Sequence, residues 1–202
     1  MHVSRKRLVL GLDLSTQSLS AVALDIDARK KIAEHSLDYL DDARLNTFGI
    51  RKPDYILPPR AEGEADQPPG LFLAALDAMF TDLKEIIPLE DVAVINTSGQ
   101  QHGHVYLGGN ASSVFKSLQE TGTRQSNLNS LLKNSLAGDR APIWMTSDSV
   151  KQAAFIRRAT GGKEKLIELS GSDAQLRFTG IIIRRTAEQF PGVYVKTRII
   201  QL

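Results

Sequence analysis

The sequence predicts an α/β protein in which a mixed sheet is flanked by helices. Three observations support this prediction. The chain begins with three short segments of strand character joined by tight turns, which is the pattern of an antiparallel meander. A strongly periodic helix follows, and a short apolar segment comes soon after it. A meander followed by helix–strand alternation is typical of helices packed against a partly parallel sheet.

The meander occupies the first part of the chain. Residues 7–14 are almost entirely apolar, which predicts a strand in the middle of the sheet. Residues 20–25 predict a returning strand and residues 32–37 a weaker third strand. The hydroxyl-rich segment 15–18 and the charged segment 27–30 are expected to form the two turns.

Residues 39–70 are expected to be an irregular insertion within the domain. The segment is polar and holds five of the eight prolines, Pro53, Pro58, Pro59, Pro68 and Pro69. A stretch of this length without regular structure is usually functional or mobile, and the alternative is a variable surface excursion. Both interpretations stay open at this point.

The best helix is expected at residues 71–87, where apolar side chains recur at helical spacing and Pro88 prevents continuation. A polar, weakly periodic region runs from about residue 111 to residue 141. The other expected elements are a buried strand at 92–96, strands at 103–107 and 142–145, and helices at 147–160 and 163–169. The most economical architecture is ribonuclease-H-like, with an antiparallel hairpin extending a partly parallel sheet.

Composition narrows the classes of function. Lys and Arg total 25 against 23 for Asp and Glu, and a net charge of +2 argues against a nucleic-acid-coating protein. The absence of cysteine excludes disulfides and zinc–thiolate sites and fits a reducing cytoplasm. No apolar run approaches the roughly 20 residues of a membrane span, and Asp13 interrupts the stretch that imitates a signal peptide. We therefore expect a cytoplasmic protein without nucleic-acid or membrane partners.

The first candidate site lies where the apolar run 7–14 ends. Asp13 sits at the end of the predicted strand, and Ser15, Thr16 and Gln17 follow in the turn. Backbone N–H groups and hydroxyls in such a turn suit a phosphate, and one carboxylate plus phosphate oxygens and waters suits Mg²⁺. The alternative is an Asp-initiated turn in which Asp13 caps its own backbone.

The second candidate site is the segment TSGQQHGHVYL, residues 97–107. Two glycines bracket Gln100, Gln101 and His102, so the backbone can bend closely while three polar side chains project. Such side chains can bind several hydroxyls at once, as sugar recognition requires; the alternative for His102 is a satisfied loop histidine. His104 lies two residues on, and in an extended strand both rings would share one face.

Two further segments each carry one candidate. Trp144 in PIWMTSDS, residues 142–149, is the only tryptophan and is expected to fill core space rather than to contact a ligand. Arg177 in RFTG, residues 177–180, precedes an apolar residue and a predicted turn. Its guanidinium can point into a polar crevice, and the alternative is an ordinary surface arginine.

Together, and in this order, the motifs GLDLSTQSLSAVALD, SGQQHGHVYL, PIWMTSDS and SGSDAQLRFTG resemble the N-terminal lobe of the FGGY carbohydrate kinases. Within that family the sequence is most similar to xylulose kinases, in which QQHG and RFTG are characteristic. The resemblance runs from about Leu8 to the C-terminus and is weakest across residues 39–70 and 111–140. It implies an actin/hexokinase-type fold of two lobes, with residues 1–202 forming the N-terminal lobe.

The resemblance also implies roles for the candidate residues. Asp13, Ser15, Thr16 and Gln17 would form the first phosphate loop, with Asp13 near Mg²⁺. His102 and Arg177 would bind sugar hydroxyls, with Gln101 as a neighbour. ATP and Mg²⁺ would be the cofactors, and the γ-phosphoryl group would pass to a ketopentose, most plausibly D-xylulose, to give the 5-phosphate. Catalysis of this kind is chiefly positioning and charge neutralisation.

Two departures from the family pattern qualify that expectation. Thr146 stands where the family usually has Asp, and Asp148 could compensate only if the backbone shifted. The family's general base and adenosine-binding lobe lie beyond the position of Leu202, so the chain looks truncated and is not expected to turn over ATP. An inactive sugar-binding or regulatory fragment is the alternative, and a homo-oligomer of the full-length parent stays open.

A ribonuclease-H-like nuclease also places Asp on its first strand, but it gathers further carboxylates around two metal ions. The segment after residues 92–96 offers Thr97 and Ser98 and no acid, so the sequence disfavours that class.

Overall fold

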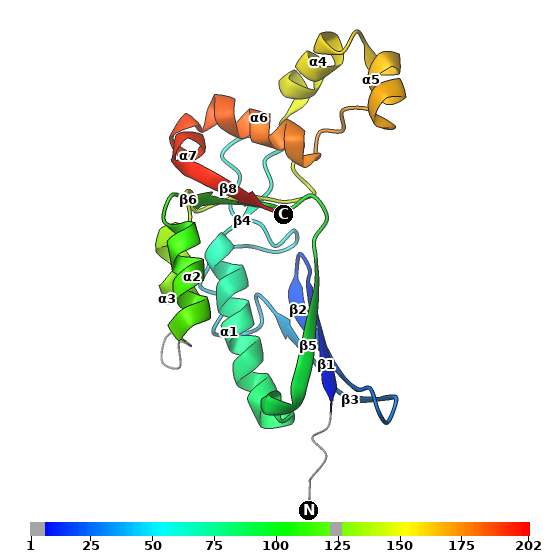
Figure 1. Cartoon of the computed structure of the whole chain (residues 1–202). Coiled ribbons are helices and arrows are strands. Elements are labelled where there is room, and N and C mark those ends of the chain that lie inside the picture. The colour runs from blue at the N-terminus through cyan, green and yellow to red at the C-terminus, as the bar shows by residue number, and fades with distance from the viewer. Residues whose placement is uncertain (1–6, 122–126) are drawn as a thin grey trace, which may run out of the picture.

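The computed structural model describes residues 7–121 and 127–202. Its main sheet has four strands in the order β3-β2-β1-β5 (Figure 1), formed by β1 (Leu8–Leu14), β2 (Ser18–Asp25), β3 (Lys30–Asp38) and β5 (Val92–Gly99). Antiparallel pairing joins β1 to β2 and β2 to β3, whereas β1 and β5 are parallel. The first strand therefore lies inside the sheet, as predicted, and the hairpin extends a parallel pair in the ribonuclease-H-like manner.

One face of this sheet carries the core. Every second residue of β1 is buried, at Leu8, Leu10 and Leu12, which is the period-2 pattern of a half-covered strand. Helix α1 (Pro69–Ile86) lies against this face and buries one stripe of side chains at helical spacing, namely Leu71, Ala75, Ala78, Met79 and Leu83. A proline occupies the first helical position of α1, where a missing N–H costs nothing, and Pro88 follows its end.

The segment between β3 and α1 is built of turns and bends, apart from the two-residue strand β4 (Asp66–Gln67). It is not a surface excursion, because Tyr39, Leu45, Ile50 and Tyr55 are buried in the same core as β1 and α1. Two of the prolines expected in the loop belong elsewhere, since Pro68 caps α1 and the helix begins at Pro69.

The second half of the chain forms smaller sheets and short helices above the main sheet (Figure 1). Strand β6 (Val105–Gly108) pairs with β8 (Thr197–Gln201), and β4 pairs with β7 (Ala141–Pro142). The remaining elements are α2 (Ala111–Thr121), α3 (Leu128–Leu132), α4 (Val150–Ala159), α5 (Lys163–Ser170), α6 (Thr179–Gln189), α7 (Pro191–Lys196) and the 3₁₀ turns Leu89–Asp91 and Lys133–Ser135.

Several expectations for this half require correction. The segment 103–107 contributes a strand only from Val105, and residues 142–145 contribute only Pro142 to β7. Helix α4 begins at Val150 rather than at residue 147. The polar region after residue 110 contains α2 and α3, whose weak apolar periodicity hid them. A helix begins within RFTG, at Thr179, where a turn was expected.

The strand expected to be buried at residues 92–96 is exposed. Val94 and Ile95 are 54% and 49% exposed, and every residue of β5 from Ala93 to Gly99 is exposed. Composition predicted burial, but β5 is an edge strand that pairs only with β1 among the described residues. An apolar run is therefore no guarantee of burial when nothing packs over it.

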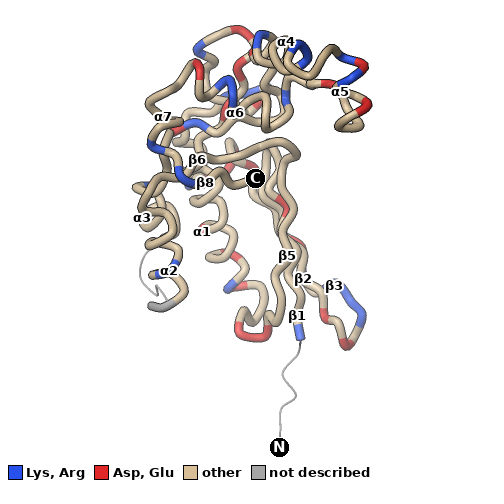
Figure 2. The backbone as a smooth tube through the Cα atoms, turned by 45° about the horizontal axis from the view of Figure 1, so that its top comes forward, with Lys and Arg blue, Asp and Glu red and all other residues tan. Residues whose placement is uncertain are grey.

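A cluster of charged side chains, most of them buried, joins the two halves of the molecule. We call Arg60, Glu64, Asp66, Arg140, Asp148 and Arg185 the ion cluster. The Arg185 Nη2 lies 2.5 Å from Asp148 Oδ2 and 3.2 Å from Glu64 Oε1. The side chains of Glu64, Asp66 and Arg185 are at most 2% exposed. Figure 2 shows basic residues along α4, α6 and α7, the end of the molecule that contains this cluster.

The ion cluster predicts a pH-dependent stability. Burial, with the charge of Glu64, raises the pKa of Asp66 to about 7. The folded state therefore holds a proton that the unfolded chain, with a carboxyl pKa of about 3.9, releases at lower pH. The contribution is present at pH 4 and is lost as pH rises through 7, so the free energy of unfolding should fall by about 2–4 kcal/mol over that window.

For Glu64, hydrogen bonds from Arg60 outweigh the effect of burial and lower the pKa to about 2. The contribution of Glu64 to stability therefore changes mainly below this pH window. Urea unfolding between pH 4 and 8 measures the effect, and Asp66→Asn should flatten the curve. Asp54→Asn, at an exposed carboxyl outside the cluster, should leave it unchanged. Because the lowered pKa values of His102 and His104 act in the opposite direction over this range, the comparison with Asp66→Asn is decisive, and identical pH profiles of the two proteins would contradict the assignment.

No helix in the described ranges has both the length and the apolar character needed to span a bilayer.

Candidate functional site

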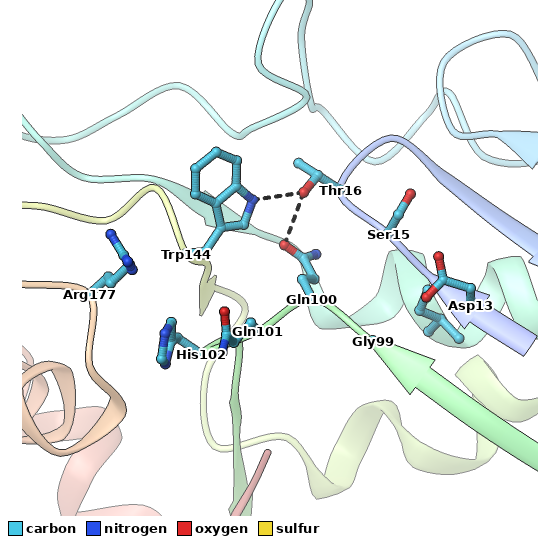
Figure 3. Close-up of a pocket in the computed structure, with 10 residues that line it drawn as sticks. Asp13, Ser15, Thr16, Gly99, Gln100, Gln101, His102, Trp144 and Arg177 are labelled. Carbon is cyan, nitrogen blue, oxygen red and sulfur yellow. Dashed lines mark hydrogen bonds between the residues drawn. The ribbon is translucent and has the colours of Figure 1, made fainter. Parts of the chain in front are cut away.

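A cavity of about 440 Å³ lies where the carboxyl ends of β1 and β5 meet the loops of the second half (Figure 3). Ligands of open α/β sheets bind at this edge, because neighbouring parallel strands end there together. Residues from all four sequence motifs line the cavity: Asp13, Leu14, Ser15, Thr16, Gly99, Gln100, Gln101, His102, Trp144 and Arg177.

Asp13 stands at the sheet end of the cavity with an exposed side chain. The Ser98 hydroxyl of the neighbouring strand donates a hydrogen bond to its Oδ1. The turn after β1 is capped by Ser15, whose Oγ donates to the Ser18 carbonyl at 3.0 Å and accepts from the Ser18 N–H at 3.2 Å. Because Ser15 performs the capping that the alternative interpretation gave to Asp13, the carboxylate of Asp13 stays available at the cavity.

Gln17 is the member of the expected phosphate loop that does not line the cavity. Its side chain is exposed at the tip of the turn, and its carbonyl accepts a hydrogen bond from the Tyr39 N–H at 2.9 Å. Within the described residues, the backbone N–H groups of Thr16 and Gln17 donate to no protein atom. They are donors of the kind that bind a phosphate in a turn.

His102 and Arg177 lie at the opposite end of the cavity from Asp13 (Figure 3). His102 has a left-handed backbone, with φ of 66°, and its ring centroid is 5.1 Å from that of Phe178. Burial, with the positive charge of Arg177, lowers the pKa of His102, so the imidazole is neutral at pH 7 and can both donate and accept. Gln101 is exposed beside it.

His104 belongs to the interior rather than to the site. The left-handed turn at His102 separates the two rings, so the expectation that they share one face is wrong. The His104 Nδ1–H donates to the His102 carbonyl at 3.1 Å, and Nε2 lies 2.8 Å from the Tyr106 hydroxyl. Burial lowers the pKa of His104, and no cluster of metal-binding side chains is found in the described part of the chain.

Trp144 is a cavity residue and does not fill core space. Its side chain is 46% exposed, and its Nε1–H donates to Thr16 Oγ1 at 2.9 Å. The preceding Ile143 takes the core position instead, at 2% exposed. The expectation from residue type was wrong, because the backbone direction of this segment decides which side chain turns inward.

Thr146, which stands where the resemblance expects Asp, is buried below the cavity. Its hydroxyl donates to the Ala65 carbonyl at 2.7 Å, a bond that a carboxylate could not make. Asp148 does not substitute at the cavity, because its carboxylate is paired with Arg185 in the ion cluster.

Sequence reasoning missed Gln67, which lies behind the cavity wall. Gln67 is fully buried and binds the backbone of the Thr16 turn, and Gln100 links Gln67 to the Thr16 hydroxyl. Gln100 was visible between its glycines, but no sequence pattern singled out Gln67, which follows an irregular segment.

The sequence of the chain is similar to those of fungal D-xylulose kinases. The chain is 34% identical over 200 residues to a probable D-xylulose kinase A of Aspergillus fumigatus, covering 98% of this chain and 33% of that protein. It is 34% identical over 196 residues to D-xylulose kinase A of Aspergillus niger, again covering 33% of the relative. The chain therefore spans about a third of the length of these relatives. No family model matches the chain.

Solved structures show the same fold at low identity. A xylulose kinase from Bifidobacterium adolescentis aligns over 98% of this chain and 33% of its own, with a TM-score of 0.65 and 20% identity. A structure described as a xyloylose kinase from Brucella ovis aligns over 96% and 32%, with a TM-score of 0.66 and 17% identity. These observations show that the chain resembles the N-terminal lobe of an FGGY xylulose kinase and has the fold of these sugar kinases.

Proposed function

We propose that this chain is the sugar- and phosphate-binding lobe of an ATP-dependent kinase that phosphorylates the ketopentose D-xylulose. One observation carries the proposal: a single cavity is lined by the Asp13 turn at one end and by His102 and Arg177 at the other. A phosphoryl donor and a polyhydroxy acceptor need such a pair of subsites side by side.

The acceptor end of the cavity has the chemistry of sugar recognition. A neutral imidazole at His102 pairs with a hydroxyl as donor or acceptor, and Arg177 contributes guanidinium donors. Gln101 adds an amide that can donate or accept a hydrogen bond. We propose that these three side chains bind the sugar hydroxyls.

The donor end has the chemistry of phosphate binding. The N–H groups of Thr16 and Gln17, which donate to no protein atom within the described residues, suit phosphate oxygens, with the Ser15 turn holding them in place. Asp13 fits a hydrated Mg²⁺, since this ion commonly takes one or two carboxylates together with phosphate oxygens and waters. When bound, Mg²⁺ would neutralise charge on the transferred phosphoryl group.

The 202-residue chain is proposed to bind sugar without phosphorylating it. Among the described residues that line the cavity, Asp13 is the only carboxylate, and it stands at the phosphate end rather than beside His102. Buried Thr146 adds no acid to the acceptor end. A regulatory or inactive sugar-binding module is the second candidate, and the same side chains favour it.

Nuclear magnetic resonance titration with D-xylulose tests the binding step. Shifts should concentrate at residues 99–102, at the indole of Trp144 and at the guanidinium of Arg177. Glycerol, which is shorter and has fewer hydroxyls, is the matched comparison and should cause smaller shifts. An unchanged spectrum at high millimolar xylulose would contradict the proposal, and ATP-dependent formation of a sugar phosphate by this chain would contradict the non-catalytic part.

A further inference from the structure

Gln67 is a buried amide with all three of its hydrogen bonds directed at different segments. Its side chain is 0% exposed, and its Nε2 donates to the Thr16 carbonyl and to the Tyr55 carbonyl, both at 2.7 Å. Its Oε1 accepts from Gln100 Nε2 at 2.6 Å. The amide thereby joins the β1–β2 turn, the segment before α1 and the loop after β5.

The same hydrogen bonds continue to the cavity surface. Thr16 Oγ1 donates to Gln100 Oε1 at 3.3 Å and accepts from Trp144 Nε1–H at 2.9 Å, as the dashed lines in Figure 3 show. We call Gln67, Gln100, Thr16 and Trp144 the Gln67 network. Three of its members line the cavity, whereas Gln67 lies behind them.

The chemistry of position 67 is restrictive. A primary amide supplies two donors and an acceptor at once, which neither a carboxylate nor an apolar side chain of similar length can do. Without it, two buried backbone carbonyls would lose their partner, and Gln100 would lose one of the contacts that orient it. Unpaired buried groups are costly, so the local backbone should move to find water or other partners.

We propose that Gln67 is a positioning residue, which sets the separation between the Thr16 turn and the Gln100 loop in the cavity wall. Its ligand consequence rests on the proposed sugar-binding function, but its geometric consequence does not. Trp144 gives a direct measure of that geometry, because it is the only tryptophan and is itself the last member of the network.

The test compares Gln67→Met with wild type in the full 202-residue chain. Gln152→Met is the matched control, since Gln152 is also a buried glutamine, 3% exposed, whose Nε2 donates to Glu188 at 2.7 Å outside the cavity. Three measurements are made on each protein: urea unfolding, Trp144 emission with acrylamide quenching, and calorimetric titration with D-xylulose.

Both variants should lose stability, but only Gln67→Met should change the site. We expect its Trp144 emission to shift to longer wavelength, its acrylamide quenching constant to rise, and its xylulose affinity to fall about tenfold, equivalent to about 1.4 kcal/mol. Gln100→Met replaces a half-buried side chain and should destabilise the fold less than Gln67→Met does. It should change the Trp144 emission and quenching in the same direction.

A folded Gln67→Met protein with wild-type Trp144 emission and quenching would overturn the proposal. So would unchanged Trp144 signals in Gln100→Met, should Gln67→Met not fold. If wild type fails to bind xylulose, the proposed function fails, while the fluorescence comparison still decides the role of Gln67.

Discussion

Replacing Arg185 with methionine is expected to lower the free energy of unfolding by about 3–5 kcal/mol, because removing one partner of a buried ion pair strands the other charge. Arg185 is 2% exposed and donates to Asp148 through both Nε, at 2.9 Å, and Nη2, at 2.5 Å. Its Nη2 also donates to Glu64 at 3.2 Å. Methionine keeps most of the side-chain volume, so little of the lost stability should come from a new cavity. Most of it should come from the buried carboxylates of Asp148 and Glu64, which would be left without their partner.

Urea unfolding at pH 7 measures this effect, and Arg158→Met provides the control. Arg158 is an exposed arginine on α4, and its replacement should change the free energy by less than about 0.5 kcal/mol. Equal effects of the two substitutions would show that the ion cluster contributes no more than ordinary surface charge.

Removing the imidazole of His102 is expected to weaken D-xylulose binding by tenfold or more, about 1.4 kcal/mol or above. Glycine is the suitable replacement, because the backbone φ of 66° suits glycine without strain. His102→Ala should lose the same affinity and be about 1–2 kcal/mol less stable than His102→Gly, since a side chain with a Cβ is disfavoured in the left-handed region. Arg177→Met should weaken binding through the lost guanidinium donors.

Calorimetric titration with D-xylulose measures these changes. His35→Gln is the control, because His35 binds Asp82 at 2.9 Å outside the cavity and should leave the affinity unchanged. Wild-type affinity in His102→Gly would remove His102 from the proposed sugar subsite. Urea unfolding of His102→Gly and His102→Ala measures the backbone strain, and the titration measures the contact with the sugar, so the two effects are determined separately.

The local elements were predictable because short-range patterns specify them. The apolar run along residues 8–14 and the helical spacing across residues 71–87 each depend on neighbours within a few positions, and both elements formed as expected. The pairing of β1 with β2 followed from the short turn between them. Helices α2 and α3 were missed, because their polar sequences carry little periodic signal.

The positions of the candidate motifs were also predictable, but the burial of individual side chains was not. Trp144 was expected in the core and lies in the cavity, whereas His104 was grouped with His102 and lies in the interior. Residue type gives only an average tendency to be buried. The direction of the backbone at each position depends on what the rest of the chain packs against it.

The sequence by itself determined the α/β class, the central first strand and the four motifs that carry the family relationship. Only the tertiary structure decided which side chains stand behind the site. Glu64 and Arg185 meet across 121 positions, Thr16 and Trp144 across 128, and Gln67 and Thr16 across 51. No local pattern records such contacts, because a buried polar group finds its partner through the packing of distant segments and not through the spacing of its neighbours.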